Sequence, residues 1–294
     1  MMKLLITGAD GFLGARAAAY YRAKGWEVTA CGHRSLDITD TAAVKAAFAQ
    51  ASPQLVFHCA AIADTGRAQR EPALSFAVNV GGTANVAAAC AETGAKLVYM
   101  SSDQVYTGCG GTEPLAEDAE LHPENVYGTD KLSAERRAAA LCPDAVGLRL
   151  AWMYDFAPGG AWPENGGWPA RIAAAAAGEP LEASPREHRG ITCVWEVVSR
   201  LGGAAGLPGG VYNFGSENAQ NSLETWRAAA RLMGCEAADI RENTTWPPRN
   251  LSMDGAKLRA FGLAMPDTLE GLRRALAARR AAPDDAEARM KEYL

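Results

Sequence analysis

Short apolar runs alternate with alanine-rich or amphipathic stretches through the first half of the chain. The apolar runs are five or six residues long and predict buried strands at 3–7, 26–31, 54–59, 96–101 and 146–150. The stretches between them predict helices at 12–24, 41–50, 72–92 and 126–141. Continuous apolar strands separated by helices are typical of a parallel sheet covered on both faces. We therefore expect an α/β fold built on a doubly wound parallel sheet.

The second half of the chain has a less regular pattern. An apolar run near 209–215 predicts a further buried strand that returns to the sheet, and 157–169, rich in Gly, Pro and Trp, predicts a loop. Helices are expected at 172–177, at 222–233 with Ser222 as the cap, and twice more after Pro248. We expect three parts: a domain of residues 1–150 with the returning strand, a smaller α/β region of 151–208 and 216–280, and a peripheral helical tail at 281–294.

Composition restricts the possible partners and location. Of the 294 residues, 48% are hydrophobic and 21% are charged, and 29 Lys and Arg against 34 Asp and Glu give a formal net charge of -5. Proteins that grip phosphate backbones are usually basic, so we expect no nucleic-acid partner. No apolar run approaches the roughly 18 to 20 residues of a membrane span, and no signal-peptide core follows Lys3. We therefore expect no membrane partner and a cytoplasmic location.

Cysteine and histidine supply no evident site. The seven cysteines are scattered without a C-x-x-C pair, and the four histidines share no metal-ligand spacing. This pattern favours free thiols and no metal site.

A glycine-rich loop directly follows the first predicted strand and precedes the first predicted helix. It reads Thr7-Gly8-Ala9-Asp10-Gly11-Phe12-Leu13-Gly14. Gly8 permits a tight turn, Gly11 lets the backbone approach a pyrophosphate, and Gly14 lets the helix pack closely on the sheet. The helix N-terminus favours phosphate through its free N–H groups. The loop, in which Asp10 caps or orients the turn, therefore predicts a dinucleotide site.

The end of the second predicted strand bears on the choice of dinucleotide. NAD sites usually carry an acidic residue there, which accepts hydrogen bonds from the ribose hydroxyls. This chain has Cys31-Gly32-His33-Arg34-Ser35 and no carboxylate before Asp37. Arg34 can contact a 2′-phosphate, and the missing acid removes a repulsion against it. We therefore expect NADPH/NADP+ as the cofactor rather than NADH.

Tyr127 and Lys131 are four residues apart on a predicted helix, so they share one face. A phenol has a pKa of about 10, and a nearby ammonium favours the phenolate, which lowers that pKa toward the neutral range. Ser102 lies at the carboxyl end of a predicted parallel strand, where ligands of such sheets bind, and its hydroxyl suits a substrate carbonyl. We therefore predict Ser102, Tyr127 and Lys131 as a catalytic set.

Together these motifs resemble the extended short-chain dehydrogenase/reductase superfamily, and within it most closely the dTDP-4-dehydrorhamnose reductase group. Besides the glycine loop, the matching stretches lie at 36–40, 58–61, 71–72, 78–80, 101–106, 127–131 with Glu135, 149–154, 248–253 and 257–258. The resemblance implies a Rossmann-type sheet with a smaller, mostly C-terminal substrate-binding region. It also implies NADPH-dependent reduction of a keto-sugar nucleotide.

The resemblance further implies roles for individual residues. Tyr127 would protonate the carbonyl oxygen as the nicotinamide delivers hydride, Lys131 would hold the nicotinamide ribose, and Ser102 would orient the carbonyl. Asp37 and Ile38 would lie by the adenine, with Ala60 and Ala61 by the ribose and phosphates. The substrate contacts are expected at Asp103, at Arg189 with a diphosphate, and at Trp152, which either stacks on a base or sugar or fills the interface between the two regions. Because relatives are often dimers, a homodimer is also expected.

The chain departs from the group at a few positions. Ser102 stands where members usually carry Thr, Gln104 stands where they carry Tyr, and 189–197 is closer to the epimerase and dehydratase pattern. Dehydratases of the superfamily carry Glu at the position of Gln104, so dehydration is disfavoured. The alternatives are a nucleotide-sugar epimerase, a reductase of another small carbonyl compound, or a non-catalytic NADP-binding regulatory subunit. Because the net charge is negative and the expected ligands are anionic, positive charge should gather locally, at Arg34, Lys131 and Arg189.

Overall fold

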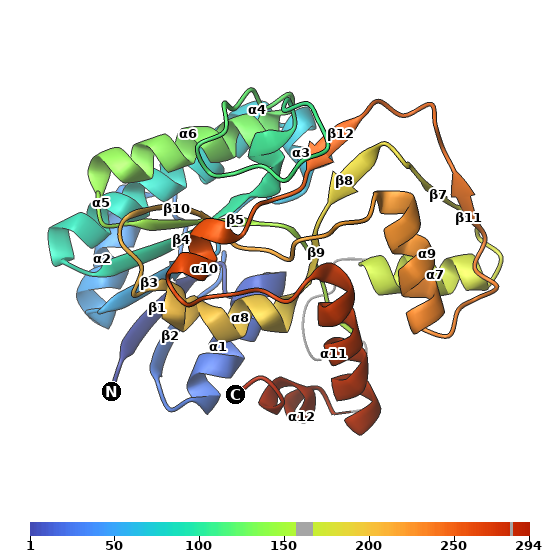
Figure 1. Cartoon of the computed structure of the whole chain (residues 1–294). Coiled ribbons are helices and arrows are strands. Elements are labelled where there is room, and N and C mark those ends of the chain that lie inside the picture. The colour runs from blue at the N-terminus through green and yellow to red at the C-terminus, as the bar shows by residue number, and fades with distance from the viewer. Residues whose placement is uncertain (157–166, 283–284) are drawn as a thin grey trace.

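A parallel sheet forms the centre of the molecule in a computed structural model that describes residues 1–156, 167–282 and 285–294. Within these residues, six strands pair in the order β10-β5-β4-β3-β1-β2. They are β1 (Lys3–Thr7), β2 (Glu27–Cys31), β3 (Leu55–His58), β4 (Lys96–Ser102), β5 (Val146–Leu150) and β10 (Gly210–Asn213). Every pair is parallel, and the returning strand β10 joins the sheet beside β5 (Figure 1). The predicted α/β fold is confirmed.

Helices cover both faces of the sheet. One face carries α1 (Phe12–Ala23) and α8 (Val194–Ala204), and the other carries α2 (Thr41–Ala51), α5 (Thr83–Thr93) and α6 (Val126–Leu141) (Figure 1). Successive strand residues therefore face two separate apolar cores, as Leu4 and Leu5 of β1 do. This burial on both sides explains why the strands appear in the sequence as continuous apolar runs.

The strand order reverses at β1, which has β2 on one side and β3 on the other. In open α/β sheets, ligands bind at the carboxyl ends of the strands beside such a reversal. The glycine loop follows β1 and residues 58–61 follow β3, so the fold places both segments at this edge of the sheet.

The helix expected over 72–92 is interrupted by a wider turn. After α3 (Thr65–Arg70), the chain forms α4 (Pro72–Phe76), a π-helical turn η1 (Ala77–Gly82) and then α5. The turn brings Asn79 inside, where its Oδ1 accepts from the Ile62 N–H at 2.9 Å and its Nδ2 donates to the Ile62 carbonyl at 3.1 Å. A π turn of this kind changes which side chains of a helical run face the interior.

The same run corrects one expectation from the sequence. In the part of the chain that the structure describes, Pro72–Thr93 is the one helical run long and apolar enough to cross a membrane by length and composition. Half of its apolar window is buried inside the molecule, and α5 packs against α2 and α6. We therefore attribute its apolar character to the core.

A smaller region is built from short elements beyond β5. Its strands have three residues each and pair two by two: β6 (Trp152–Tyr154) with β9 (Ile191–Cys193), β7 (Leu181–Ala183) with β11 (Ile240–Glu242), and β8 (Glu187–Arg189) with β12 (Arg249–Leu251). Its helices are α7 (Trp168–Ala176), α9 (Ser222–Leu232), α10 (Ala256–Ala260) and α11 (Thr268–Ala281). Strands this short show no clear alternation of polar and apolar residues, so the sequence pattern did not predict most of them.

Two helix starts differ from the expectation. Helix α7 begins at Trp168 with Pro169 in its first turn, so the last part of the predicted loop is helical, while 157–166 lies outside the described residues. Helix α9 is capped by Asn221 and not by Ser222. The Asn221 Oδ1 accepts from the Glu224 N–H and the Glu224 Oε2 accepts from the Asn221 N–H, which makes a capping box.

The C-terminal tail is anchored to the first helix. It contains α12 (Ala286–Lys291), whose Met290 is buried in the main core. The Tyr20 hydroxyl donates to the Tyr293 carbonyl at 2.7 Å, and the Tyr293 ring stacks on Trp195 with centroids 6.5 Å apart. The tail therefore covers apolar surface beside α1 and α8.

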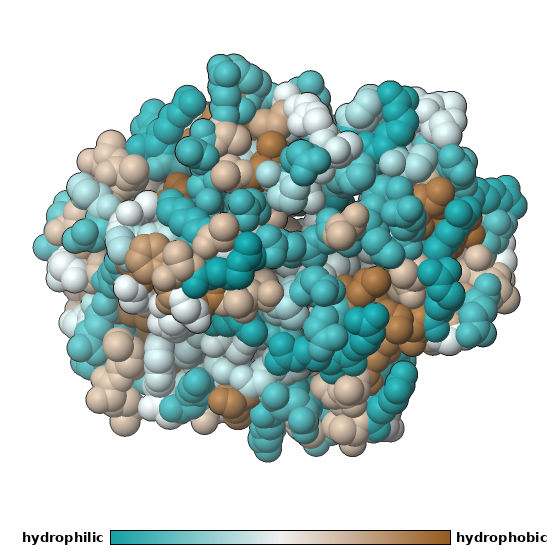
Figure 2. All heavy atoms as spheres, in the orientation of Figure 1, coloured by the Kyte–Doolittle hydropathy of each residue, from teal (hydrophilic) through white to brown (hydrophobic). Residues whose placement is uncertain are grey.

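Hydrophilic residues dominate the face shown in Figure 2, and apolar residues appear there in small, separate patches. The large apolar side chains that stay exposed among the described residues include Leu74 and Phe76 of α4. Scattered exposed apolar residues are normal for a globular protein. The expected homodimer stays a prediction.

Candidate active site

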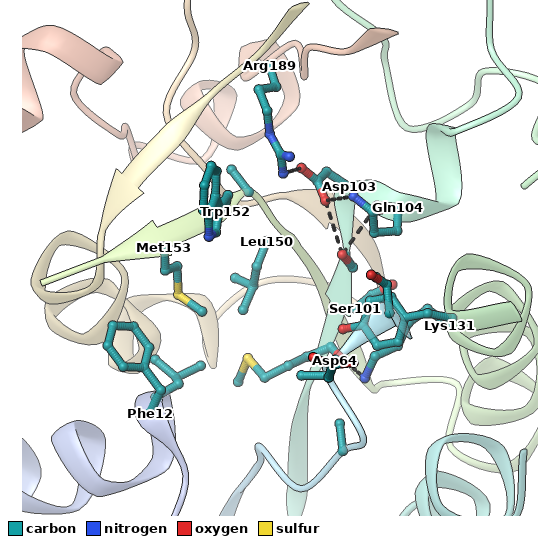
Figure 3. A pocket seen from close by; sticks show the side chains of 18 of the residues that line it. Phe12, Asp64, Ser101, Asp103, Gln104, Lys131, Leu150, Trp152, Met153 and Arg189 are labelled. Carbon is teal, nitrogen blue, oxygen red and sulfur yellow. Dashed lines mark hydrogen bonds and ion pairs between the residues drawn. The ribbon is translucent and has the colours of Figure 1, made fainter. Parts of the chain in front are cut away.

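A cavity of about 770 Å³ lies at the carboxyl edge of the sheet, between the sheet and the smaller region. Figure 3 shows Phe12 on one side of it, Lys131 on the opposite side, and Arg189 pointing toward Asp103. Among the predicted site residues, the lining includes Gly11, Phe12, Leu13, Gly14, Ala61, Ser102, Asp103, Tyr127, Lys131, Trp152 and Arg189. The predicted residues outside the lining are Gly8, Asp10, Arg34, Asp37, Ile38 and Ala60.

The glycine loop has the geometry that a pyrophosphate requires. Gly8 has a φ of +67°, and a Cβ there would lie 2.6 Å from the Ala60 backbone. A Cβ on Gly14 would lie 2.2 Å from the Gly8 carbonyl oxygen, so only glycine lets the helix start this close to β1. Helix α1 has no side-chain cap at Gly11, which leaves its first N–H groups for a ligand. These residues fit a dinucleotide phosphate.

The end of β2 carries a carboxylate that comes from another segment. The Asp10 side chain lies so close to Gly32 that a Cβ on Gly32 would be 1.7 Å from the Asp10 Oδ2. Arg34 is exposed in the turn that follows. No acid was expected at this position because β2 itself has none, and the structure brings Asp10 there from the glycine loop.

Asp37 and Ile38 have structural contacts of their own. The Asp37 Oδ1 accepts from the Thr39 N–H at 2.9 Å and from the Thr39 hydroxyl at 2.7 Å, and these bonds lower the pKa of the Asp37 carboxyl. Ile38 is buried against Gly82. Their predicted position beside an adenine stays a prediction.

Ser102, Tyr127 and Lys131 come together on one side of the cavity. Helix α6 presents Tyr127 and Lys131 on one face, and Ser102 is the last residue of β4. The Ser102 side chain lies close enough to the Tyr127 hydroxyl to act on the pKa of the phenol. The Lys131 Nζ donates to the Met100 carbonyl at 2.9 Å and lies 5.6 Å from the centre of the Tyr127 ring. This set has the groups needed to orient a carbonyl and move a proton to it.

Burial, and not Lys131, dominates the protonation of Tyr127. Burial raises the pKa of Tyr127 above its ordinary value, the hydrogen bond with Ser102 opposes this shift, and the Asp103 carboxylate adds to it. The expected lowering of the Tyr127 pKa by Lys131 is therefore wrong for this structure. Burial also lowers the pKa of Lys131 to about 8, and the nearby carboxylates of Glu135 and Asp130 oppose this shift.

The lowered pKa of Lys131 predicts a pH-dependent contribution to stability. In the unfolded chain the lysine keeps its proton up to a pKa of 10.5, whereas the folded protein releases it at about 8. Between these values the unfolded chain binds more protons, so a rise in pH shifts this contribution toward the folded state. In urea titrations, the unfolding free energy of wild type minus that of Lys131→Met should increase from about pH 7.5 to about pH 9.5. A flat or falling difference would contradict the assignment.

Asp103 connects two of the predicted site residues in the cavity. Its Oδ1 accepts from Ser102 Oγ at 3.1 Å, and its Oδ2 accepts from the Arg189 Nη2 at 2.7 Å. The Arg189 guanidinium also lies 5.3 Å from the Trp152 ring centre, and the buried Arg189 Nε has no hydrogen-bond partner among the described residues. Arg189 is therefore held in the cavity between Asp103 and Trp152.

The expected local excess of positive charge is wrong for this cavity. Among the described residues its cations are Lys131, Arg171, Arg189 and Arg249, and its anions are Asp64, Asp103, Glu182 and Glu187. Glu187 lies 3.9 Å from the Arg189 Nη1 and 3.5 Å from the Arg249 Nη1. Arg189 and Arg249 are thus partly neutralised before any ligand binds.

Several residues that line the cavity were not predicted from the sequence. Arg249 and Glu187 come from β12 and β8, and Trp226, Trp246 and Arg171 also line the cavity, with Arg171 5.3 Å from the Trp226 ring centre. The available signal was weak: Arg249 belongs to a stretch that matches the family's C-terminal pattern, which by itself assigns it no role.

A buried polar network connects β4, β5 and α6. Arg149 of β5 forms a two-pronged ion pair with Glu135 of α6, with contacts of 3.0 and 2.8 Å, and both side chains are almost fully buried. The Ser101 hydroxyl donates to Glu135 at 2.6 Å, and Arg149 donates to the Tyr106 hydroxyl at 2.7 Å. The network ties the helix that carries Tyr127 to the strand that carries Ser102.

The parallel Rossmann-type sheet, the glycine loop and the Ser102, Tyr127 and Lys131 set define an NAD(P)-dependent oxidoreductase of the extended short-chain dehydrogenase/reductase class. A family model described as the RmlD substrate binding domain matches residues 2–162, more than half of the chain. A dTDP-4-dehydrorhamnose reductase of Streptomyces griseus is 35% identical over 278 residues, covering 88% of this chain and 88% of the relative. The chain belongs to the dTDP-4-dehydrorhamnose reductase (RmlD) family, and the predicted resemblance is confirmed.

Two further similarities concern the fold and about half of the chain. A solved dTDP-4-dehydrorhamnose reductase from Bacillus anthracis str. Ames, in complex with NADP, has a TM-score of 0.83 and 24% identity and covers 94% of this chain and 99% of its own; it supports the fold. The methionine adenosyltransferase 2 subunit beta of Xenopus laevis is 36% identical over 159 residues, which is 52% of this chain and 47% of that protein. The chain thus spans about half the length of this relative.

Proposed function

We propose that the protein is an NADPH-dependent reductase of a keto-sugar nucleotide. The observation that carries the proposal is that Ser102, Tyr127 and Lys131 meet in the same cavity as the uncapped N-terminus of α1. This juxtaposition puts a proton donor next to a place for a dinucleotide. The reductase relative that aligns over most of the chain supports the same activity.

The residues divide the reaction between them. When bound, the reduced nicotinamide supplies the hydride. Tyr127 stays protonated at neutral pH because burial raises its pKa, and it gives its proton to the carbonyl oxygen. Ser102, whose side chain lies beside the phenol, orients that oxygen, and the Lys131 ammonium stabilises the phenolate that remains.

The smaller region holds the sugar nucleotide in this proposal. Arg189 and Asp103 lie beside Ser102, where they suit the hydroxyls of the sugar or the first phosphate, and Trp152 forms a wall under Arg189. Trp226, Trp246 and Arg171 line the cavity as well, and their aromatic rings suit the base of a nucleotide. In this division, 151–208 and 216–280 supply most of the substrate contacts, Ser102 and Asp103 add to them from the 1–150 domain, and that domain binds the cofactor.

The dinucleotide preference has a specific test, because Arg34 and Asp10 favour opposite cofactors at the end of β2. If Arg34 binds a 2′-phosphate, Arg34→Ala should weaken NADPH binding about tenfold, the value of one charge-assisted contact, and leave NADH binding unchanged. Asp10→Asn is the matched variant, since loss of a carboxylate that accepts from ribose hydroxyls would weaken NADH. Titration of all three proteins with both cofactors decides; tighter NADH than NADPH binding by wild type would overturn the NADPH preference.

The proposed function is tested by NADPH oxidation with a panel of keto-sugar nucleotides that differ in sugar and base. We expect turnover with at least one 4-keto-6-deoxy sugar nucleotide. A second candidate, a non-catalytic binding subunit, is favoured by the similarity to the Xenopus subunit beta. Tight NADPH binding without oxidation by any member of the panel would support that candidate and refute the reductase.

A further inference from the structure

We propose that Gln104 is a positioning residue that links Arg249, an arginine of the cavity lining that we assign to an anionic group of the substrate, to Asp103 and to the start of the helix that carries Tyr127; this inference rests on the proposed function. Gln104 belongs to the short turn η2 (Asp103–Tyr106), lines the cavity and is 6% exposed. Nothing in its side chain can titrate or react. Its importance lies in the three groups that it holds.

The three hydrogen bonds of Gln104 fix the orientation of its amide. The Gln104 Oε1 accepts from the Arg249 Nη2 at 2.7 Å and from the Asn125 Nδ2 at 3.3 Å. The Gln104 Nε2 donates to the Asp103 Oδ1 at 3.2 Å. Arginine can only donate and an ionised carboxylate can only accept, so a side chain between them needs both functions at once. Glutamine is a neutral side chain that has them.

One of these bonds reaches the catalytic helix. Asn125 is the N-cap of α6, and its Oδ1 accepts from the Gly128 N–H at 2.7 Å. A Cβ on Gly128 would lie 2.3 Å from the Gln104 carbonyl oxygen, so the first turn of α6 packs directly on η2. Tyr127 lies between these two contacts in the chain. A change at Gln104 should therefore shift the first turn of α6 and with it the Tyr127 hydroxyl.

The other end of the link reaches the smaller region. Arg249 belongs to β12, lines the cavity and shares Glu187 with Arg189. A carboxylate at position 104 would neutralise Arg249 and repel Asp103, whereas the glutamine amide orients Arg249 and leaves its charge for an anionic group of the substrate. Gln104 thus connects the orientation of Arg249, which binds the substrate in this proposal, to the position of the Tyr127 hydroxyl.

The first test compares Gln104→Ala with Gln104→Glu in steady-state kinetics. Gln104→Ala should raise the KM for the sugar nucleotide at least tenfold and lower kcat, while the Kd for NADPH stays within about twofold. In Gln104→Glu, the introduced carboxyl regains a donor toward Asp103 when protonated, so its kcat/KM relative to wild type should rise as the pH falls. The same ratio for Gln104→Ala should be independent of pH.

The matched control is Gln69→Ala. The Gln69 Oε1 also accepts a hydrogen bond at the start of α6, from the Val126 N–H at 3.4 Å, but Gln69 is exposed and does not line the cavity. Its kinetic constants should match those of wild type. Equal effects of Gln69→Ala and Gln104→Ala would reduce Gln104 to a general support of the helix and overturn the proposal.

The decisive test is a double-mutant cycle of Gln104→Ala and Arg249→Met. If Gln104 acts on the substrate through Arg249, the double variant should have about the KM of Arg249→Met alone. If the KM increases of the two single variants multiply in the double variant, Gln104 and Arg249 act independently and the proposal is overturned. The same cycle is measured by calorimetric titration with dTDP and with UDP, and thermal melting checks that every variant is folded. Absence of turnover by wild type refutes the proposed reductase, while the titrations still decide whether Gln104 acts through Arg249.

Discussion

Replacing Tyr127 by phenylalanine should lower kcat by about 10²- to 10⁴-fold, the usual value of a positioned proton donor, with NADPH binding within about twofold of wild type. The ring keeps its packing beside Lys131, so only the hydroxyl is lost. Stopped-flow oxidation of NADPH under single-turnover conditions measures the chemical step directly, and fluorescence titration measures the cofactor affinity.

Tyr212→Phe is the matched control for this substitution. The Tyr212 hydroxyl donates to the Pro208 carbonyl at 2.9 Å on the edge strand β10, and the residue does not line the cavity. Its loss should cost about 1 kcal/mol of stability and leave kcat unchanged. A Tyr127→Phe variant with the wild-type rate would show that another group delivers the proton.

Breaking the buried ion pair between Arg149 and Glu135 should cause a large loss of stability. Arg149→Met leaves the Glu135 carboxylate buried without its guanidinium, and we expect the free energy of unfolding to fall by about 3–5 kcal/mol. Urea titration at neutral pH measures the change. Lys45→Met, which removes one partner of the exposed pair with Glu92, should barely move the urea midpoint.

A double variant tests the physical reason for this loss. In Arg149→Met with Glu135→Leu the buried charge is gone as well, so the protein should recover part of the stability that Arg149→Met loses. If the two single changes simply add, the cost does not come from an uncompensated buried charge. If Arg149→Met folds too poorly for titration, the unfolding free energy of the double variant can still be measured and compared with that of wild type.

The features that the sequence revealed depend on short spacing. The glycine loop and the pair of Tyr127 and Lys131 are each set by residues within one turn or one helix, so their spacing alone predicts their geometry. The parallel sheet was equally accessible, because its strands are buried on both faces and form continuous apolar runs. The cap of α9 was misplaced by one residue, which is an ordinary uncertainty at a helix end.

The contacts that escaped prediction join distant segments. Arg249 meets Gln104 across 145 positions of sequence, and the strand that presents Arg249 has three residues, too few for a pattern. Asp10 reaches Gly32 only because β1 and β2 are neighbours in the sheet. The raised pKa of Tyr127 has a similar origin, since burial is a property of the whole fold and outweighs the nearby ammonium. Sequence spacing contains no information on desolvation.

The central claim is that the cavity reduces a carbonyl with hydride from the nicotinamide and a proton from Tyr127. It is tested most directly with NADPH deuterated at both C4 positions of the nicotinamide and the best keto-sugar nucleotide of the panel. We expect a product that carries one deuterium on the former carbonyl carbon and is formed in the same amount as NADP+. Tyr127→Phe should form almost none of this product. A sugar nucleotide that is isomerised without deuterium and without net NADPH oxidation would contradict the account and identify an epimerase.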